Sequence, residues 1–329
     1  MTTLWEVITF TVQTSAVGNA SDRLYANGQM QVPVIVSIRA IIGDTGASYH
    51  LTQSELQSIK LIDYYSRKEL TGTWFYSTTE NVFSHTLPGS RAPVEPIADG
   101  TQSIYFWVSS TKMESTNIAA QISQPGKDQP TIITTTGGSF DSKVTLTAIQ
   151  PVTYTTSNVT FTREDTAEGT WNKKQGSSTT KYNWDQDNYY LTSNVYPFLK
   201  VDRHEVDTSG YNNGAVRIGE MRDSFAYLEV GSSDVSIFFM FNMGKEATVA
   251  YADIKVNQKV NALCLTRLRF FKGAWYSDWE QNAWFTIYDL YGNSGSFWVK
   301  PEEKNTMSIS SKNTRSSTEP TSIEPAAKL

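Results

Sequence analysis

Apolar residues occupy every second position over the segment Gln31–Ile42. One face of this segment is entirely apolar and consists of Val32, Val34, Val36, Ile38, Ala40 and Ile42. Gln31, Ser37 and Arg39 fall on the opposite face. A side-chain period of two is typical of a β-strand that buries one face, so we expect a half-buried antiparallel strand here.

Similar runs recur along the chain and are separated by turn-forming pairs such as Asn27-Gly28. The runs are Trp5–Val12, Ser103–Ser109, Thr131–Thr135, Lys143–Ile149, Val152–Phe161, Tyr189–Ser193, Ala215–Gly219, Phe225–Val230, Val235–Phe241, Ala262–Phe271, Ala283–Leu290 and Ser296–Lys300. Only Ser54–Ile59 suggests a helical turn, with Ser54 as its N-cap. This pattern predicts an all-β fold of antiparallel β-sandwiches, most like the immunoglobulin-type architecture.

The chain is 329 residues long, which exceeds the roughly 250–300 residues at which a single core stops growing. Two domains are therefore expected. Near residue 163 the composition becomes poor in apolar residues, as in a linker. The expected divisions are a β-sandwich domain over 1–162, a linker or long loop over 163–181, an aromatic-rich β-sandwich domain over 182–300 and an extended low-complexity tail over 301–329.

Charge and cysteine content exclude several classes of protein. The formal net charge of −5 gives no excess of positive charge with which to bind the phosphates of a nucleic acid. A single cysteine, Cys264, cannot form an intrachain disulfide, and its apolar neighbours predict a buried thiol. No apolar run approaches the roughly 20 residues of a membrane-spanning helix. The first residues lack the basic region of a Sec signal peptide, so we expect a cytoplasmic protein or export by a non-Sec route.

The sharpest short motif is Asp44-Thr45-Gly46, which resembles the catalytic loop of aspartic proteases. That chemistry needs two carboxylates that share a proton. No second Asp-Thr/Ser-Gly occurs in the chain, and Gly43 stands where the protease loop has a hydrophobic residue. We therefore expect a hairpin turn, in which Asp44 bonds its own backbone.

The three histidines, His50, His85 and His204, are far apart and have no partner at metal-ligand spacing. The chain also lacks a nucleophile elbow, a P-loop and a dinucleotide fingerprint. We expect no catalytic residue, no metal site and no cofactor, and therefore no enzyme.

Aromatic and polar residues cluster between two expected strands of the second domain. The residues nominated there for ligand or partner binding are Trp275, Tyr276, Asp278, Trp279 and Glu280. Their rings either plug one end of the sandwich, stack against a sugar, or form an interface with a partner. The sequence leaves these three interpretations open.

The tail from Pro301 to Leu329 is too poor in apolar residues to fold alone. Its segment best patterned to add to a sheet edge begins at Met307, with Met307 and Ile309 facing inward. We expect this docking to be intermolecular. The resulting hypothesis is a non-enzymatic structural or binding protein that self-assembles, as a homo-oligomer or larger assembly, or attaches to a surface. The alternatives are a lectin-like carbohydrate-binding module that uses the loop of Trp275, Tyr276 and Trp279, and a secreted β-sandwich toxin or virulence-type protein.

Overall fold

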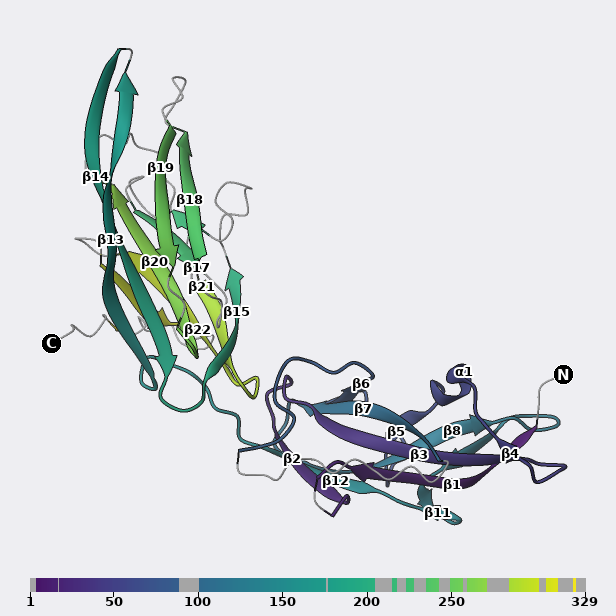
Figure 1. Cartoon of the computed structure of the whole chain (residues 1–329). Coiled ribbons are helices and arrows are strands. Elements are labelled where there is room, and N and C mark those ends of the chain that lie inside the picture. The colour runs from purple at the N-terminus through teal and green to yellow at the C-terminus, as the bar shows by residue number, and fades with distance from the viewer. Residues whose placement is uncertain are drawn as a thin grey trace. The chain divides into compact units, whose positions relative to one another are not determined.

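The structure is a computed structural model of the whole chain. It describes residues 4–16, 18–88, 101–175, 177–204, 215–217, 223–227, 235–242, 249–256, 259–270, 284–301, 306–312 and 322–323. The chain divides into two compact units (Figure 1). Unit 1 comprises Met1–Pro151 and Tyr291–Asn293, and unit 2 comprises Val152–Leu290 and Ser294–Leu329. The main division therefore follows Pro151 and not residue 162. The predicted all-β class with antiparallel sheets is confirmed.

In its described residues, unit 1 is built from two five-stranded sheets, a two-stranded sheet of β10 and β11, and one short helix. Its strands are β1 (Trp5–Thr14), β2 (Ser21–Tyr25), β3 (Val32–Ile42), β4 (Ser48–Tyr49), β5 (Lys60–Asp63), β6 (Trp74–Ser77), β7 (Gln102–Ser110), β8 (Ser115–Gln124), β9 (Thr131–Thr134), β10 (Thr136–Gly137), β11 (Phe140–Asp141) and β12 (Val144–Ile149). One sheet has the order β1-β3-β7-β6, with β4 beside β3, and the other has the order β2-β12-β8-β5, with β9 beside β8. These pairs are antiparallel apart from the parallel β2–β12 pair. Helix α1 (Gln53–Leu56) has Thr52 as its N-cap, and not the expected Ser54.

The core of unit 1 follows from the alternation along β3. Val32, Val34, Val36 and Ile38 are fully buried, whereas Arg39 is exposed. β3 lies between β1 and β7, so both of its edges are hydrogen-bonded within the sheet. Its inward face packs in the unit's apolar interior, as the period of two predicts.

The described residues of unit 2 form two five-stranded sheets and a separate hairpin. Its strands are β13 (Val159–Gln175), β14 (Ser178–Ser193), β15 (Phe198–His204), β16 (Ala215–Arg217), β17 (Asp223–Tyr227), β18 (Val235–Asn242), β19 (Val249–Val256), β20 (Ala262–Phe270), β21 (Trp284–Asp289), β22 (Ser294–Pro301), β23 (Met307–Ser311) and β24 (Ser322–Ile323). The sheet orders are β13-β14-β20-β17-β16 and β15-β21-β22-β23-β24, and β18 pairs with β19.

Residues 163–181 form most of a long hairpin, so the expectation of a linker or loop is wrong. β13 and β14 pair continuously from Val159–Ser193 to Gln175–Ser178, with one bulge. β20 pairs with β14 only between Trp184 and Thr192. The part of the hairpin beyond this pairing is largely polar, and its backbone groups are paired between β13 and β14.

Part of the tail forms a strand of unit 2. Strand β23 pairs with β22 of its own chain in this structure, and the expected docking onto a second copy stays a prediction. Met307 and Ile309 are fully buried, in a core cluster that also contains Phe297 and Val299. An inward-facing pattern of two apolar side chains suits this position, because β22 already offers an edge beside the core.

Candidate functional site

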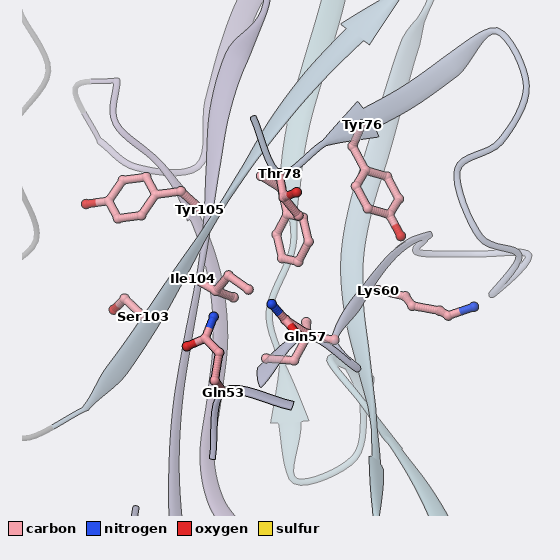
Figure 2. Close-up of a pocket in the computed structure, with 10 residues that line it drawn as sticks. Gln53, Gln57, Lys60, Tyr76, Thr78, Ser103, Ile104 and Tyr105 are labelled. Atoms are coloured by element: carbon pink, nitrogen blue, oxygen red, sulfur yellow. The ribbon is translucent and has the colours of Figure 1, made fainter. Parts of the chain in front are cut away.

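An open groove of about 640 Å³ lies in unit 1 among α1, β5, β6 and β7 (Figure 2). We call it the edge groove. Its lining residues are Gln53, Gln57, Ile59, Lys60, Tyr76, Thr78, Ser103, Ile104, Tyr105 and Phe106. The lining combines an apolar part with amide, hydroxyl and phenol groups, which is the usual make-up of a ligand site.

The apolar part of the edge groove comes from side chains of the core. Ile59 and Phe106 are both buried, so each presents only a small area to the groove. Tyr105 is 43% exposed. Figure 2 shows Tyr105 and Tyr76 on opposite sides of the groove, with the Gln57 amide between them. A ligand here would meet the two tyrosine side chains, the small exposed area of Phe106 and a polar rim.

The groove exists because β6 covers only part of its neighbour. β6 pairs with β7 from Trp107 to Ser110, and β6 ends at Ser77. On its other edge β7 pairs with β3 from Gln102 to Val108. The segment Gln102–Phe106 therefore has a strand on one side only, and the groove runs along its open edge.

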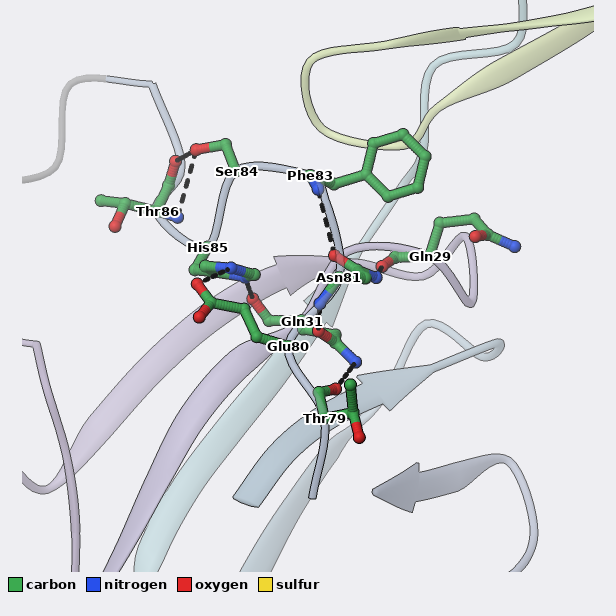
Figure 3. Close-up of polar contacts among 9 residues, drawn as sticks. All are labelled: Gln29, Gln31, Thr79, Glu80, Asn81, Phe83, Ser84, His85 and Thr86. Atoms are coloured by element: carbon green, nitrogen blue, oxygen red, sulfur yellow. Dashed lines mark hydrogen bonds and ion pairs between the residues drawn. The ribbon is translucent and has the colours of Figure 1, made fainter. Parts of the chain in front are cut away.

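Hydrogen bonds to Gln31 explain why the chain leaves the sheet after β6 (Figure 3). The Gln31 side chain donates to the Thr79 carbonyl at 3.3 Å and accepts from the Asn81 N–H at 2.8 Å. His85 Nδ1 lies 3.0 Å from the Gln31 carbonyl oxygen, and its ring packs 4.4 Å from that of Trp107. These bonds pull the segment after β6 toward the start of β3, so it does not continue along β7.

Helix α1 is fixed against the sheet and presents two amides to the groove. Thr52 and Glu55 form a capping box, in which each side chain accepts from the other residue's backbone N–H. Glu55 also accepts from the buried Trp5 indole at 2.7 Å. Gln53 and Gln57 are four residues apart, so they lie on one face of the helical turn. That face lines the groove.

A polar triad fixes the Tyr76 side of the groove. Glu69 accepts from Lys60 Nζ at 2.7 Å and from the Tyr76 hydroxyl at 2.9 Å. Burial, together with the bond to Glu69, raises the pKa of Tyr76 to about 12. The hydrogen bond from Lys60 lowers the pKa of Glu69. The Tyr76 hydroxyl is therefore held in its protonated form and Glu69 in its ionised form.

Among the residues of unit 2 that the structure describes, one set is suited to a cation. Asp165, Asp185 and Asp187 each place a carboxylate oxygen within 4.8 Å of the others. Asp165 lies opposite Asp187 across the β13–β14 hairpin, so the sequence spacing did not reveal the cluster. Arg163 pairs with the buried Asp187 at 2.7 Å, yet burial and the neighbouring aspartates raise the Asp187 pKa. Carboxylates at this spacing are ligands that Ca²⁺ prefers, but Arg163 already balances part of the charge.

The aromatic loop nominated from the sequence lies outside the described residues. Those nominated residues are Trp275, Tyr276, Asp278, Trp279 and Glu280. Trp284, at the end of the same aromatic stretch, is described and half-buried. Its ring stacks 3.5 Å from that of His204, and Lys312 Nζ lies 3.1 Å from its centroid. The Trp284 ring is thus engaged within unit 2.

The remaining residues singled out from the sequence have structural positions. Asp44 is exposed in the turn after β3, which closes when the Gly46 N–H donates to the Ile42 carbonyl at 2.8 Å. Thr45, not Asp44, supplies the side chain that bonds this turn, by accepting from the Ala47 N–H. Met307 and Ile309 are core residues of unit 2. The structure brings none of these residues to the edge groove.

Comparisons with known proteins leave the chain without an assigned family. No protein-family model matches it, and no curated protein matches it. It is similar to the structure of the C-terminal domain of the Streptococcus pyogenes antigen I/II-family protein AspA, at 11% identity, over 88% of this chain and 97% of that chain. The TM-score of 0.18 is too low for this likeness to support any argument. No helix in the described part of the chain is long and apolar enough to cross a membrane.

None of the patterns considered in the sequence predicts the edge groove. One signal was present, since Tyr105 and Trp107 are aromatic residues on the polar face of the predicted strand Ser103–Ser109. Large aromatic side chains on an outward face often mark a binding surface. The partial cover that β6 gives to β7 depends on strand pairing, which the period of two does not specify.

Proposed function

We propose that the protein is a non-enzymatic binding protein that holds its ligand in the edge groove of unit 1. The observation that carries this proposal is the groove itself: about 640 Å³ beside an open strand edge, with Tyr76 and Tyr105 on opposite sides. The walls are fixed by α1 and by the Lys60–Glu69–Tyr76 triad. Such pre-organisation lowers the entropy that a ligand loses on binding.

The chemistry of the lining supports binding and not catalysis. The described lining residues include no histidine, cysteine, aspartate or glutamate. The ionisable lining residues are Lys60, Tyr76 and Tyr105, and the first two are bonded to Glu69. General acid–base or nucleophilic catalysis needs a group that titrates near neutral pH or is activated by a neighbouring base.

The test is a search for ligands with two probes, an array of immobilised oligosaccharides and a phage-displayed library of random heptapeptides. The expected result is a set of binders that belong to one class, either oligosaccharides or peptides. Their affinity should fall at least about tenfold in the variant Tyr105→Ala, because side chains at the centre of an interface contribute most of the binding energy. Tyr65→Ala is the matched control, because Tyr65 is 70% exposed in the same unit and does not line the groove. Binders that respond equally to both variants, or no binders at all, would overturn the proposal.

Self-assembly remains a prediction. It is tested by the native mass of the full-length chain in solution, measured by light scattering across a range of concentrations. A monomeric mass throughout would exclude self-assembly and leave the binding proposal intact.

A further inference from the structure

We infer that the ligand of the edge groove is an extended peptide segment that adds to the sheet as a strand beside β7. This inference rests on the proposed function, because it names the ligand class of the same groove. It is carried by the backbone of β7, whose segment Gln102–Phe106 pairs with β3 and has no second neighbouring strand among the described residues. An unpaired strand edge is a template for an incoming strand.

The ladder on the far side of β3 shows which backbone groups point into the groove. Val12 of β1 donates its N–H to Ser142 Oγ at 2.9 Å, so this N–H points away from β3. Val12 lies opposite Val36 in β3. In an antiparallel ladder, residues alternate between pairs that exchange hydrogen bonds and pairs that do not. Val36 therefore directs its N–H and C=O toward β7, where it lies opposite Ile104.

The same alternation assigns the open edge of β7. If Ile104 bonds to β3, its neighbours Ser103 and Tyr105 direct their N–H and C=O groups to the other edge. That edge borders the groove, and both residues line it. Within the described part of the chain, no hydrogen bond is formed there by the backbone of Ser103 or Tyr105. The groove thus offers two donors and two acceptors at the spacing of a β-ladder.

The dimensions fit a short strand. A strand rises about 3.3 Å per residue, so the open segment Gln102–Phe106 matches about five residues of peptide. Successive side chains of an added strand point to opposite faces. One set would meet the apolar surface of Ile59 and Phe106, and the other set would lie near Tyr105. We expect ligands with apolar residues at alternate positions.

A proline variant isolates the backbone contribution. Ser103→Pro removes an N–H that faces the groove and leaves the bonds to β3 in place, and proline is tolerated where the missing N–H faces an open edge. We expect S103P to weaken the selected heptapeptides at least about tenfold, the equivalent of about 1.4 kcal/mol. The companion variant S103A removes only a hydroxyl that lies 3.0 Å from Ser37 Oγ, and a loss below about threefold is expected. Circular dichroism and thermal melting establish that both variants fold.

A second measurement needs no protein variant. Single N-methyl groups are placed at each backbone nitrogen of a selected heptapeptide, and binding to the wild-type chain is measured. The inference requires that methylation abolishes binding at every second position, because alternate peptide N–H groups face β7. Uniform tolerance of N-methylation, or equal binding to S103P and wild type, would overturn it.

The two probes also separate this inference from the proposed function. Binding of oligosaccharides alone, with loss in Tyr105→Ala, would overturn the peptide inference while the edge groove remained the ligand site. If neither probe gives binders that depend on Tyr105, both the peptide inference and the proposed function are overturned.

Discussion

The Trp5 indole Nε1 donates a 2.7 Å hydrogen bond to Glu55 Oε1, and this bond ties helix α1 to the first strand of unit 1. Trp5 is buried, and the other carboxylate oxygen of Glu55 accepts from the Thr52 N–H. One carboxylate therefore serves both the core and the helix cap. The position of Gln53 and Gln57 in the edge groove depends on it.

Glu55→Gln is expected to destabilise α1 in a pH-dependent way. Burial opposes ionisation of Glu55, but its hydrogen bonds outweigh burial and lower the pKa below 4.5. A lowered pKa means that the carboxylate stabilises the fold above about pH 4.5 and that this contribution is lost as the pH falls through the folded-state pKa. We expect the variant to speed hydrogen exchange of the Trp5 indole N–H near pH 7 and to approach wild type as the pH falls through the folded-state pKa of Glu55.

The control for this experiment is Glu6→Gln. Glu6 is exposed on β1, so its replacement should leave exchange at Trp5 unchanged at either pH. A difference between wild type and Glu55→Gln that persisted at acid pH would show that the carboxylate charge is not what holds the helix.

Asp44→Asn is expected to change the free energy of unfolding by no more than about 0.5 kcal/mol, the usual range for an exposed position. Asp44 is exposed, and the turn is closed by the Ile42 carbonyl. The contrasting variant is Gly46→Ala, because Gly46 has a φ of +70° and no neighbouring atom within 4 Å of an added Cβ. It should cost about 1–2 kcal/mol through backbone strain alone. Urea unfolding of both variants provides the measurement, and a larger effect at Asp44 would contradict the turn interpretation.

The Cys264 thiol is expected to be unreactive in the folded chain. It is buried on β20, and burial raises its pKa to about 12, so almost no thiolate is present at neutral pH. Labelling with a thiol reagent should be slow in buffer and fast in urea. Val260→Cys supplies a positive control, since Val260 is 83% exposed in the turn before the same strand. Fast labelling of wild type under native conditions would place the thiol at the surface.

The sequence predicts the fold better than the site, and particular residues show why. The alternation of Val32, Val34 and Val36 reports burial of one strand face directly, so β3 is found at its observed position. The residues over 163–181 have few apolar side chains, and their strands are held by backbone bonds that composition does not report. The edge groove depends on bonds between Gln31 and the segment after β6, which are remote in sequence. Register and remote pairing are properties of the folded chain and not of any local period.

Replacement of Ile309 by alanine (Ile309→Ala) tests the role of the tail in unit 2. Ile309 is fully buried in the core beside Val299, so loss of its side chain should cost about 2–5 kcal/mol. Ser310→Ala is the matched control on the same strand; Ser310 is only half-buried, and its change should stay within about 0.5 kcal/mol. Differential scanning calorimetry of the full-length chain distinguishes the effects of the two variants on stability. Because β23 completes its own unit, Ile309→Ala should lower the melting temperature without changing the native mass, and a drop in mass would instead show that the strand bridges two copies.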